Sequence, residues 1–155
     1  LIGKQMIRPA KPSDETAIRE CAISAYQQYV AVIGRKPAPM TADFAAQISA
    51  GHIHVATDDD DLPVGFVVFY PDDDTTMMLE NIAVTPALNG RGIGKCLMAV
   101  CEETARQQGF SRVRLYTNEK MSANLSIYPH LGYVETDRRT EDGFKRVYFE
   151  KTLSA

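Results

Sequence analysis

Three glycines at alternate positions, Gly90, Gly92 and Gly94, follow an apolar run at 79–84 and lead into a run at 93–108 with the apolar spacing of a helix. Glycine leaves the backbone open to an approaching ligand. A loop that opens into a helix also points N–H groups outward, beside the positive end of the helix dipole. This combination binds phosphate groups.

The two commonest phosphate-binding loops do not match this spacing. A P-loop needs Gly-x-x-x-x-Gly-Lys-Ser/Thr, but Gly94-Lys95 is followed by Cys96, and Asn89 stands where the first glycine belongs. A dinucleotide-binding loop needs Gly-x-Gly-x-x-Gly directly after a strand and an acid about 20 residues later. Here the third glycine comes one position early and 114–117 reads Arg-Leu-Tyr-Thr. The spacing therefore disfavours both an NTPase and a redox dinucleotide protein.

The composition is that of an ordinary globular domain, with 45% hydrophobic and 24% charged residues among 155. A net charge of -3 argues against a nucleic-acid surface, and no apolar run approaches the roughly 18 residues that span a bilayer. The histidines are too scattered for a metal site, and three cysteines without Cys-x-x-Cys spacing fit reduced thiols. We expect one cytoplasmic domain over 1–155, without metal, membrane or nucleic-acid partners.

Apolar periodicity predicts a mixed α/β order of elements. The expected order is a strand at 5–9, a helix from a cap at Ser13 to Val32, a helix from a cap at Thr41 to Ser49, strands at 53–56, 64–70 and 76–84, a helix at 93–108, a strand at 112–117, a helix from a cap at Ser122 to Leu131, and a hairpin of strands at 133–140 and 144–153. Short turns make the three middle strands antiparallel. The crossover through the helix at 93–108 makes its flanking strands parallel.

Two longer motifs identify a family. The stretch 79–94, Leu-Glu-Asn-Ile-Ala-Val-Thr-Pro-Ala-Leu-Asn-Gly-Arg-Gly-Ile-Gly, resembles the acyl-CoA signature of the GCN5-related N-acetyltransferase (GNAT) superfamily. The stretch 118–133 is similar to that family's helix with Asn-x-x-x-Tyr-x-x-x-Gly-Tyr/Phe, in which Asn124 and Tyr128 fill the first two places. The resemblance implies the GNAT fold, a mixed, mostly antiparallel sheet with a splayed parallel strand pair and about four flanking helices.

The resemblance also implies acetyl-CoA as the acyl donor. The backbone of Ile82 and Val84 is expected to hydrogen-bond the pantetheine amides, as an added strand does, and the N–H groups of 89–94 to hold the pyrophosphate. The family usually has Gln or Arg where this chain has Asn89, so weaker binding of the cofactor is expected. The expected cofactor-binding residues are Ile82, Ala83, Val84, Asn89, Gly90, Arg91, Gly92, Ile93, Gly94, Lys95, Asn118, Asn124 and Tyr128.

Transfer of an acyl group to an amine needs two proton movements. An amine of pKa about 10.4 must lose a proton at pH 7, at a cost of roughly 4.6 kcal/mol, and the thiolate leaves best when it receives one. Tyr128 stands at the family position of the general acid; the alternative is a packed side chain, and Pro129 is expected to disturb helical geometry there. Glu80, a carboxylate in an otherwise apolar strand, is the candidate base, with a partly exposed or Arg-paired Glu as the alternative.

The acceptor is expected to lie against residues 26–40, the side that the first helices cover in this family. The candidate acceptor contacts are Tyr26, Tyr29, Arg35, Met40 and Asn81. The acidic runs 58–61 and 72–74 would suit a polyamine, but they stand at opposite ends of one strand. Solvated turns are therefore the preferred interpretation of both runs.

The leading prediction is an N-acetyltransferase that joins acetyl-CoA and a primary amine of a small molecule or peptide in a ternary complex. The alternative is a non-catalytic module that binds or senses acyl-CoA. A ping-pong route through Cys96 or Cys101 is disfavoured, because both fit packed positions on one helix. Since members of this family often dimerise, a homodimer is also among the expectations.

Overall fold

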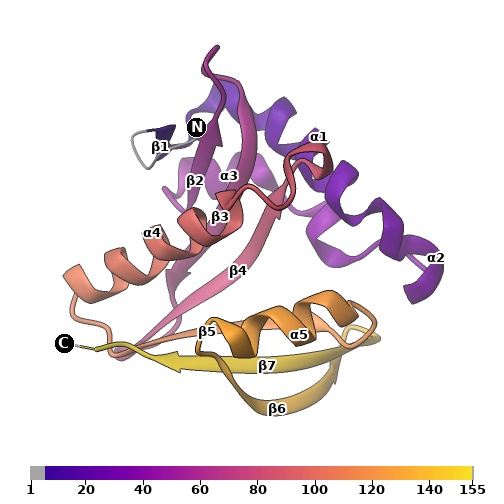
Figure 1. Ribbon diagram of the computed structural model, residues 1–155, viewed down its shortest axis with the longest axis vertical. Coiled ribbons are helices and arrows are strands. Elements are labelled where there is room, and N and C mark those ends of the chain that lie inside the picture. The colour runs from indigo at the N-terminus through magenta and orange to yellow at the C-terminus, as the bar shows by residue number, and fades with distance from the viewer. Residues whose placement is uncertain (1–5, 155) are drawn as a thin grey trace. The chain divides into compact units, whose positions relative to one another are not determined.

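The computed structural model describes residues 6–154, and its strands follow the order β1-β2-β3-β4-β5-β7-β6 in a seven-stranded sheet (Figure 1). The strands are β1 Ile7–Pro9, β2 Ile53–Thr57, β3 Pro63–Pro71, β4 Thr76–Val84, β5 Arg112–Asn118, β6 Val134–Glu141 and β7 Phe144–Thr152. The helices are α1 Glu15–Tyr26, α2 Val30–Ile33, α3 Phe44–Ser49, α4 Ile93–Gln107 and α5 Ser122–His130. The pair β4–β5 is parallel and β1–β2, β2–β3, β5–β7 and β6–β7 are antiparallel. The predicted fold class is confirmed.

The chain divides into two compact units, which we describe separately. The N-terminal unit comprises the residues up to 69 together with 81–101, and the C-terminal unit comprises 70–80 and the residues from 102 onward. Strand β4 and helix α4 each contribute to both units.

In the N-terminal unit, helices cover both faces of the sheet, because neighbouring residues of a strand point to opposite sides. Phe66 of β3 packs edge-on against Phe44 of α3, with ring centroids 5.6 Å apart. A Cβ at the neighbouring Gly65 would instead lie 3.3 Å from Leu97 of α4 and 3.1 Å from the carbonyl oxygen of Ala83. Helix α3 therefore covers one face of β3 and α4 the other (Figure 1).

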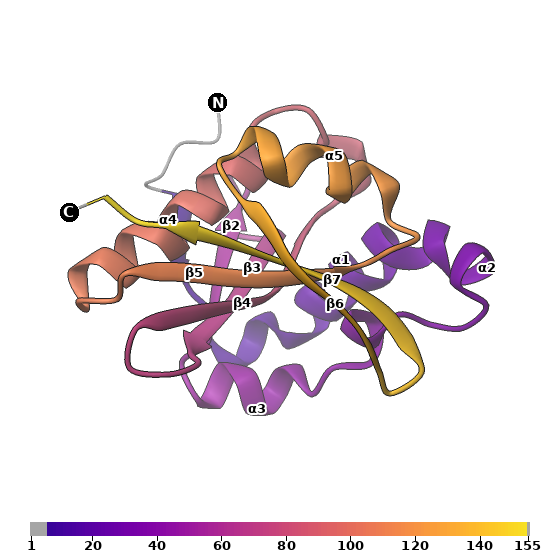
Figure 2. The same ribbon diagram turned by 90° about the horizontal axis from the view of Figure 1, so that it is seen from below.

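In the C-terminal unit, α5 covers one face of the β5–β7–β6 sheet (Figure 2). Val113, Leu115 and Thr117 of β5 are buried, and the residues between them are half-buried, which confirms the predicted alternation. The ring of Tyr128 on α5 lies 5.7 Å from that of Phe149 on β7. The parallel register of β4 and β5 runs from Thr76↔Arg112 to Leu79↔Leu115.

The predicted helix caps are wrong by one or two residues. Ser13 lies inside a 3-10 turn, and Asp14 precedes α1. Thr41 ends a second such turn, and Asp43 caps α3 by accepting a hydrogen bond from the Ala46 N–H at 3.1 Å. Ser122 is the first residue of α5. Serine, threonine and aspartate all favour caps, so a polar stretch locates a helix end only to within a few residues.

The first predicted helix is also interrupted. Helix α1 ends at Tyr26, a 3-10 turn follows at Gln27–Tyr29, and α2 ends at Ile33. The next residue is Gly34, whose φ of 92° confirms the predicted stop. The predicted first strand begins at Ile7, while its expected start at Gln5 lies outside the described residues.

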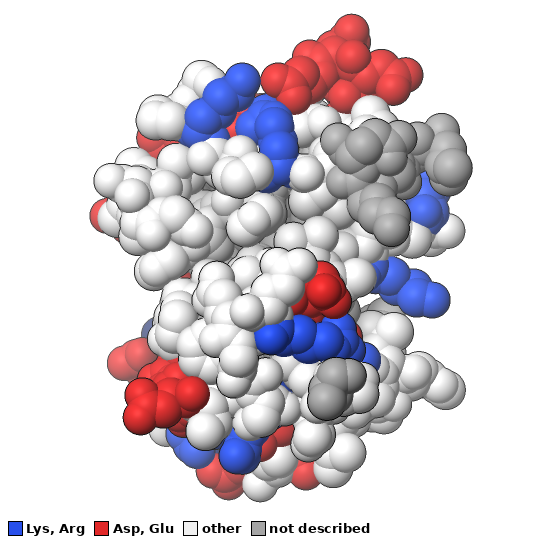
Figure 3. All heavy atoms as spheres, turned by 90° about the vertical axis from the view of Figure 1, so that its left-hand side faces the viewer, with Lys and Arg blue, Asp and Glu red and all other residues white. Residues whose placement is uncertain are grey.

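The surface carries charges of both signs. Figure 3 shows acidic and basic side chains interspersed among uncharged ones on the face that it draws. Over residues 6–154, no helix combines the length and the apolar character that crossing a membrane requires.

Candidate functional site

The glycine loop joins β4 to α4 in the N-terminal unit. After β4, a 3-10 turn at Pro86–Leu88 leads into exposed residues at 89–92. Gly90 and Gly92 have φ values of 82° and 81°, a left-handed backbone that favours glycine. The Cys96 N–H donates to the Gly92 carbonyl at 3.1 Å, so the N–H groups just before Cys96 belong to the first turn, which has no intrahelical acceptors.

The space around these glycines fits an approaching phosphate. A Cβ at Gly90 or Gly92 would meet nothing within 4 Å, and a Cβ at Gly94 would lie 3.9 Å from Val84, an ordinary contact. The protein alone therefore does not need glycine at position 94, since an alanine would fit there. A group that approaches the first turn of α4 closely does need it. Within the predicted stretch Asn89–Lys95, the residues 89–92 and Lys95 are exposed, Gly94 is half-buried, and Ile93 is buried in the core.

Two of the residues predicted to contact the amine substrate, Tyr26 and Asn81, lie against each other in the N-terminal unit. The Tyr26 hydroxyl lies 2.9 Å from Oδ1 of Asn81 and 2.8 Å from the carbonyl oxygen of Ile82. Asn81 is only 4% exposed, and its Nδ2 is buried without a hydrogen-bond partner among residues 6–154.

The other acceptor candidates differ in exposure. Met40 is 5% exposed, which makes it a core residue in the turn Ala38–Thr41. Tyr29 is half-buried and Arg35 is exposed. The surface position of Arg35 suits a contact with a negatively charged group, whereas Met40 serves packing.

Tyr128 is buried in the C-terminal unit. It is 7% exposed, and its ring centroid lies 6.1 Å from that of Tyr133 and 5.7 Å from that of Phe149. The expectation that Pro129 disturbs Tyr128 is wrong, because α5 continues through both residues to His130. Pro129 lies close to the helix end, so it removes only one N–H donor from the helix. The Tyr128 carbonyl is still satisfied, because it accepts hydrogen bonds from the N–H groups of Leu131 and Tyr133.

The two predicted asparagines of the C-terminal unit have defined partners. Nδ2 of Asn124 donates to Oγ1 of Thr117 at 3.0 Å, which orients its amide and leaves Oδ1 for a ligand N–H. Oδ1 of Asn118 accepts the Lys120 N–H at 2.9 Å and so stabilises the turn before α5. Asn118 is therefore the last residue of β5, and its side chain serves the turn that follows.

Glu80 has a partner that the sequence reading missed. It is half-buried in the C-terminal unit, and its Oε1 accepts a hydrogen bond from the Tyr70 hydroxyl at 2.7 Å. The turn between β3 and β4 explains why the two residues meet. The Asp72 N–H donates to the Thr76 carbonyl, so residues 72 and 76 lie opposite each other. In this register Tyr70 is a diagonal neighbour of Glu80 on the next strand, within reach of a long side chain.

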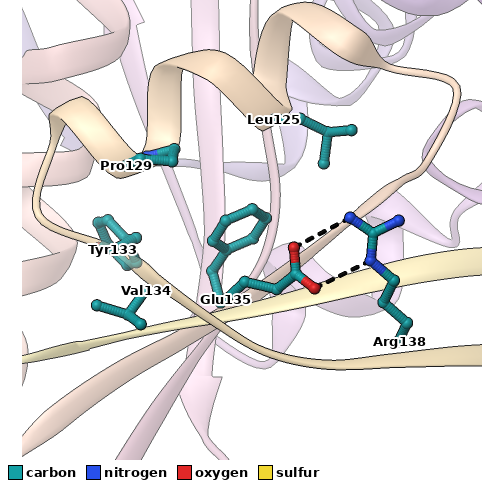
Figure 4. A pocket seen from close by; sticks show the side chains of 7 residues that line it. Leu125, Pro129, Tyr133, Val134, Glu135 and Arg138 are labelled. Atoms are coloured by element: carbon teal, nitrogen blue, oxygen red, sulfur yellow. Dashed lines mark hydrogen bonds and ion pairs between the residues drawn. The ribbon is translucent and has the colours of Figure 1, made fainter.

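The C-terminal unit also has a surface hollow of about 530 Å³ under α5 (Figure 4). Glu135 and Arg138 of β6 form a two-point ion pair at 2.9 and 3.1 Å within its lining. The lining residues are Leu125, Pro129, Tyr133, Val134, Glu135, Arg138 and Phe149. The predicted catalytic and cofactor-binding residues are not among the residues that line this hollow.

Known proteins resemble this chain in sequence. N-alpha-acetyltransferase 80 of Mus musculus is 40% identical over 58 residues, which are 37% of this chain and 17% of that protein. The uncharacterized N-acetyltransferase YjgM of Escherichia coli (strain K12) is 34% identical over 59 residues, which are 38% of this chain and 35% of that protein. The chain thus spans well under half the length of these curated relatives.

The fold is also found among solved structures. The PaiA N-acetyltransferase of Thermoplasma acidophilum, solved in complex with coenzyme A, has a TM-score of 0.75 and 20% identity over 95% of this chain and 98% of that chain. The family described as Acetyltransferase (GNAT) matches residues 17–133, a range that contains the glycine loop, Glu80 and Tyr128. Because this match covers most of the chain and both sequence motifs, the chain belongs to the GNAT acetyltransferase family.

Proposed function

We propose that this protein is an acetyl-CoA-dependent N-acetyltransferase that acts on a primary amine of a small molecule or peptide. The observation that carries this proposal is the open cradle at Gly90, Gly92 and Gly94, at the first turn of α4. The names of the relatives and the coenzyme A bound to the Thermoplasma protein support the same donor. The proposal treats the two units as one catalytic domain.

In this proposal, bound acetyl-CoA supplies an activated acetyl group as a thioester. Glu80 takes a proton from the acceptor ammonium, so that the amine nitrogen can form a bond to the acetyl carbon while the carbon–sulfur bond breaks. Tyr128 gives its proton to the leaving sulfur and regains one from the nitrogen that becomes the amide. The products are an acetylated amine, a thiol and one proton released through Glu80.

A second candidate is a module that binds acyl-CoA without catalysis. The burial of Tyr128 against Tyr133 and Phe149 favours it, because a packed tyrosine needs no chemical role. CoA release measured with a panel of primary amines separates the two functions. Release above the rate of hydrolysis with at least one amine supports the transferase. Binding of acetyl-CoA without such release supports the module, and no binding of acetyl-CoA contradicts both.

A further inference from the structure

The side-chain amide of Asn81 on β4 carries a buried donor that the protein itself does not use. Asn81 is 4% exposed, and within the part of the chain that the structure describes its Nδ2 has no hydrogen-bond partner. Buried polar groups in folded proteins almost always have a partner, because an unpaired buried donor costs stability. The unpaired Nδ2 therefore points to a group that the protein binds.

One tyrosine fixes the orientation of this amide. The Tyr26 hydroxyl lies 2.9 Å from Oδ1 of Asn81 and 2.8 Å from the carbonyl oxygen of Ile82. This contact turns Oδ1 toward Tyr26 and Nδ2 away from it. An amide nitrogen donates and does not accept, and an ammonium group likewise has only donors. The partner that Nδ2 can take is thus a hydrogen-bond acceptor such as a carbonyl oxygen, and not the charged amine itself.

Asn81 also stands where the proposed acyl-donor arm ends. In the described chain the parallel ladder of β4 with β5 stops at Leu79, although β4 continues to Val84. An extended arm can add to the remaining edge as a strand. In the proposed function the pyrophosphate lies at 89–94 and the arm follows Val84 and Ile82, so the acyl group reaches the strand beside Asn81. An amine that attacks this group must then lie close to Nδ2.

The cover over Asn81 is lightly anchored. Its contact with Tyr26 places the amide under the end of α1, and in the structure Nδ2 is closed to solvent. Tyr26 is followed by the turn Gln27–Tyr29 and by α2, and neither of these described elements has a buried side chain. Segments with few buried contacts open at low cost. Movement of this segment can therefore admit an acceptor to Nδ2.

We propose that Nδ2 of Asn81 donates to a carbonyl oxygen next to the acceptor amine, so that the acceptor is the α-amino group of a peptide or an amino acid. This inference rests on the proposed function and narrows its acceptor. An α-amino group stands one carbon away from a carbonyl or carboxylate, whereas a lysine side chain or a polyamine has no oxygen beside its amine. Acceptors of the second kind leave the buried donor unpaired and are rejected for that reason.

The test compares two acceptors on the intact protein with acetyl-CoA. Alaninamide has the oxygen beside its amine, and isopropylamine has the same amine without it. The ratio of their kcat/KM values is measured in the unsubstituted protein and in Asn81→Leu, a variant of similar shape that lacks the donor. Comparing this ratio between proteins cancels the different basicity of the two amines. Asn81→Leu is expected to lower the preference for alaninamide on the order of tenfold and to leave the Kd for CoA within about twofold.

A further arm replaces alaninamide with alanine, which has a carboxylate in place of the amide. The better substrate of the two shows whether the α-amino group belongs to a peptide, which alaninamide imitates, or to a free amino acid.

Thermal unfolding separates this role from a structural one. Asn81→Leu removes an unpaired buried donor and leaves the Ile82 carbonyl as a partner for Tyr26, so its Tm is expected to be equal or higher. Thr57→Val is the control, because it removes a buried hydroxyl of the same unit that does have a partner, the Met6 carbonyl at 3.1 Å. This control is expected to lower the Tm and to leave the acceptor ratio unchanged.

The outcomes distinguish the inference from the proposed function. A Tm of Asn81→Leu that falls as in Thr57→Val shows that the amide serves the fold, and it overturns the inference. An unchanged acceptor ratio, or a preference of the unsubstituted protein for isopropylamine, overturns it as well, while amine-dependent release of CoA still supports the transferase. If acetyl-CoA binds but no amine raises the release of CoA, the proposed function fails and the inference falls with it.

Discussion

The hydroxyl of Tyr26 on α1 lies 2.9 Å from Oδ1 of Asn81 on β4, and both side chains are buried in the N-terminal unit. The same hydroxyl approaches the carbonyl oxygen of Ile82 to 2.8 Å. One side chain of α1 thus fixes the part of β4 whose backbone is predicted to hold the pantetheine arm.

Tyr26→Phe is expected to lower the free energy of unfolding by about 1–3 kcal/mol, because it leaves buried acceptors on Asn81 and Ile82 without their donor. Urea unfolding measures the change. Tyr29→Phe removes the hydroxyl of a half-buried tyrosine three residues away and serves as the control. Equal stability of the two variants would show that the Tyr26 hydroxyl does not hold β4.

Gly65→Ala is expected to destabilise the protein by about 1–3 kcal/mol, the usual range for overpacking. The new Cβ would lie 3.1 Å from the carbonyl oxygen of Ala83 and 3.3 Å from Leu97. A strand backbone cannot shift as a flexible side chain can, so β4 must move. Thermal unfolding checks this, and a Tm equal to that of the unsubstituted protein would contradict the tight contact between β3 and β4.

Asp14 is expected to stabilise the fold most at neutral pH. It is 4% exposed and accepts hydrogen bonds from Arg8 at 2.7 and 3.1 Å and from the Lys11 N–H at 2.9 Å. Burial alone would raise the pKa of this carboxyl, but these donors outweigh it and hold the pKa below its ordinary value. The stabilisation is therefore complete above the ordinary pKa and is lost as pH falls through the folded-state value.

Asp14→Asn is accordingly expected to cost about 2 kcal/mol at pH 7 and progressively less in acid. Urea unfolding of both proteins at several pH values measures the gap. Asp43→Asn is the control, since asparagine also caps a helix well. If the difference in the free energy of unfolding between the two proteins does not shrink as the pH is lowered, the proposed pH dependence of the Asp14 contribution is contradicted.

The sequence predicts the elements better than the contacts between them. Alternation along 112–117 and the turns at 58–63 and 71–74 are local patterns, and each marks a strand or its end that the structure confirms. Helix caps also follow from local sequence, but Ser13 and Asp14 are both suited to cap the same helix. Asp14 takes the position before α1, where it accepts a hydrogen bond from Arg8. The residue types around the cap do not show which of the two will take that position.

The site shows the same division. The cradle 89–95 is contiguous in sequence, so its glycines and the following helix could be predicted together. The bond between Tyr26 and Asn81 joins residues 55 positions apart, and only the packing of α1 on β4 creates it. The prediction that Pro129 disturbs the helix was wrong, because a proline near the end of a helix disrupts it less than one in the middle, and α5 ends one residue later, at His130.

Tyr128→Phe tests the general acid. In the proposed function it is expected to lower kcat on the order of a hundredfold and to leave the fold intact, because the ring still packs against Phe149. Tyr133→Phe is the control, since the Tyr133 hydroxyl donates to Glu102 and serves stability. Single-turnover rates measure both variants, and full activity of Tyr128→Phe at every pH would contradict the acid role.

The central claim is that the loop 89–95 holds the pyrophosphate of CoA, and binding of CoA to the Gly94→Ala variant tests it most directly. The added methyl would lie 3.9 Å from Val84, an ordinary contact, and alanine favours a helix over glycine by up to about 1 kcal/mol. The variant is therefore expected to unfold at an equal or higher Tm. It is also expected to bind CoA at least about tenfold more weakly, since that methyl occupies the space that the phosphate needs. Ala99→Val, on the exposed side of the same helix, is the control. A Gly94→Ala protein that binds CoA as tightly as the unsubstituted chain would contradict the claim.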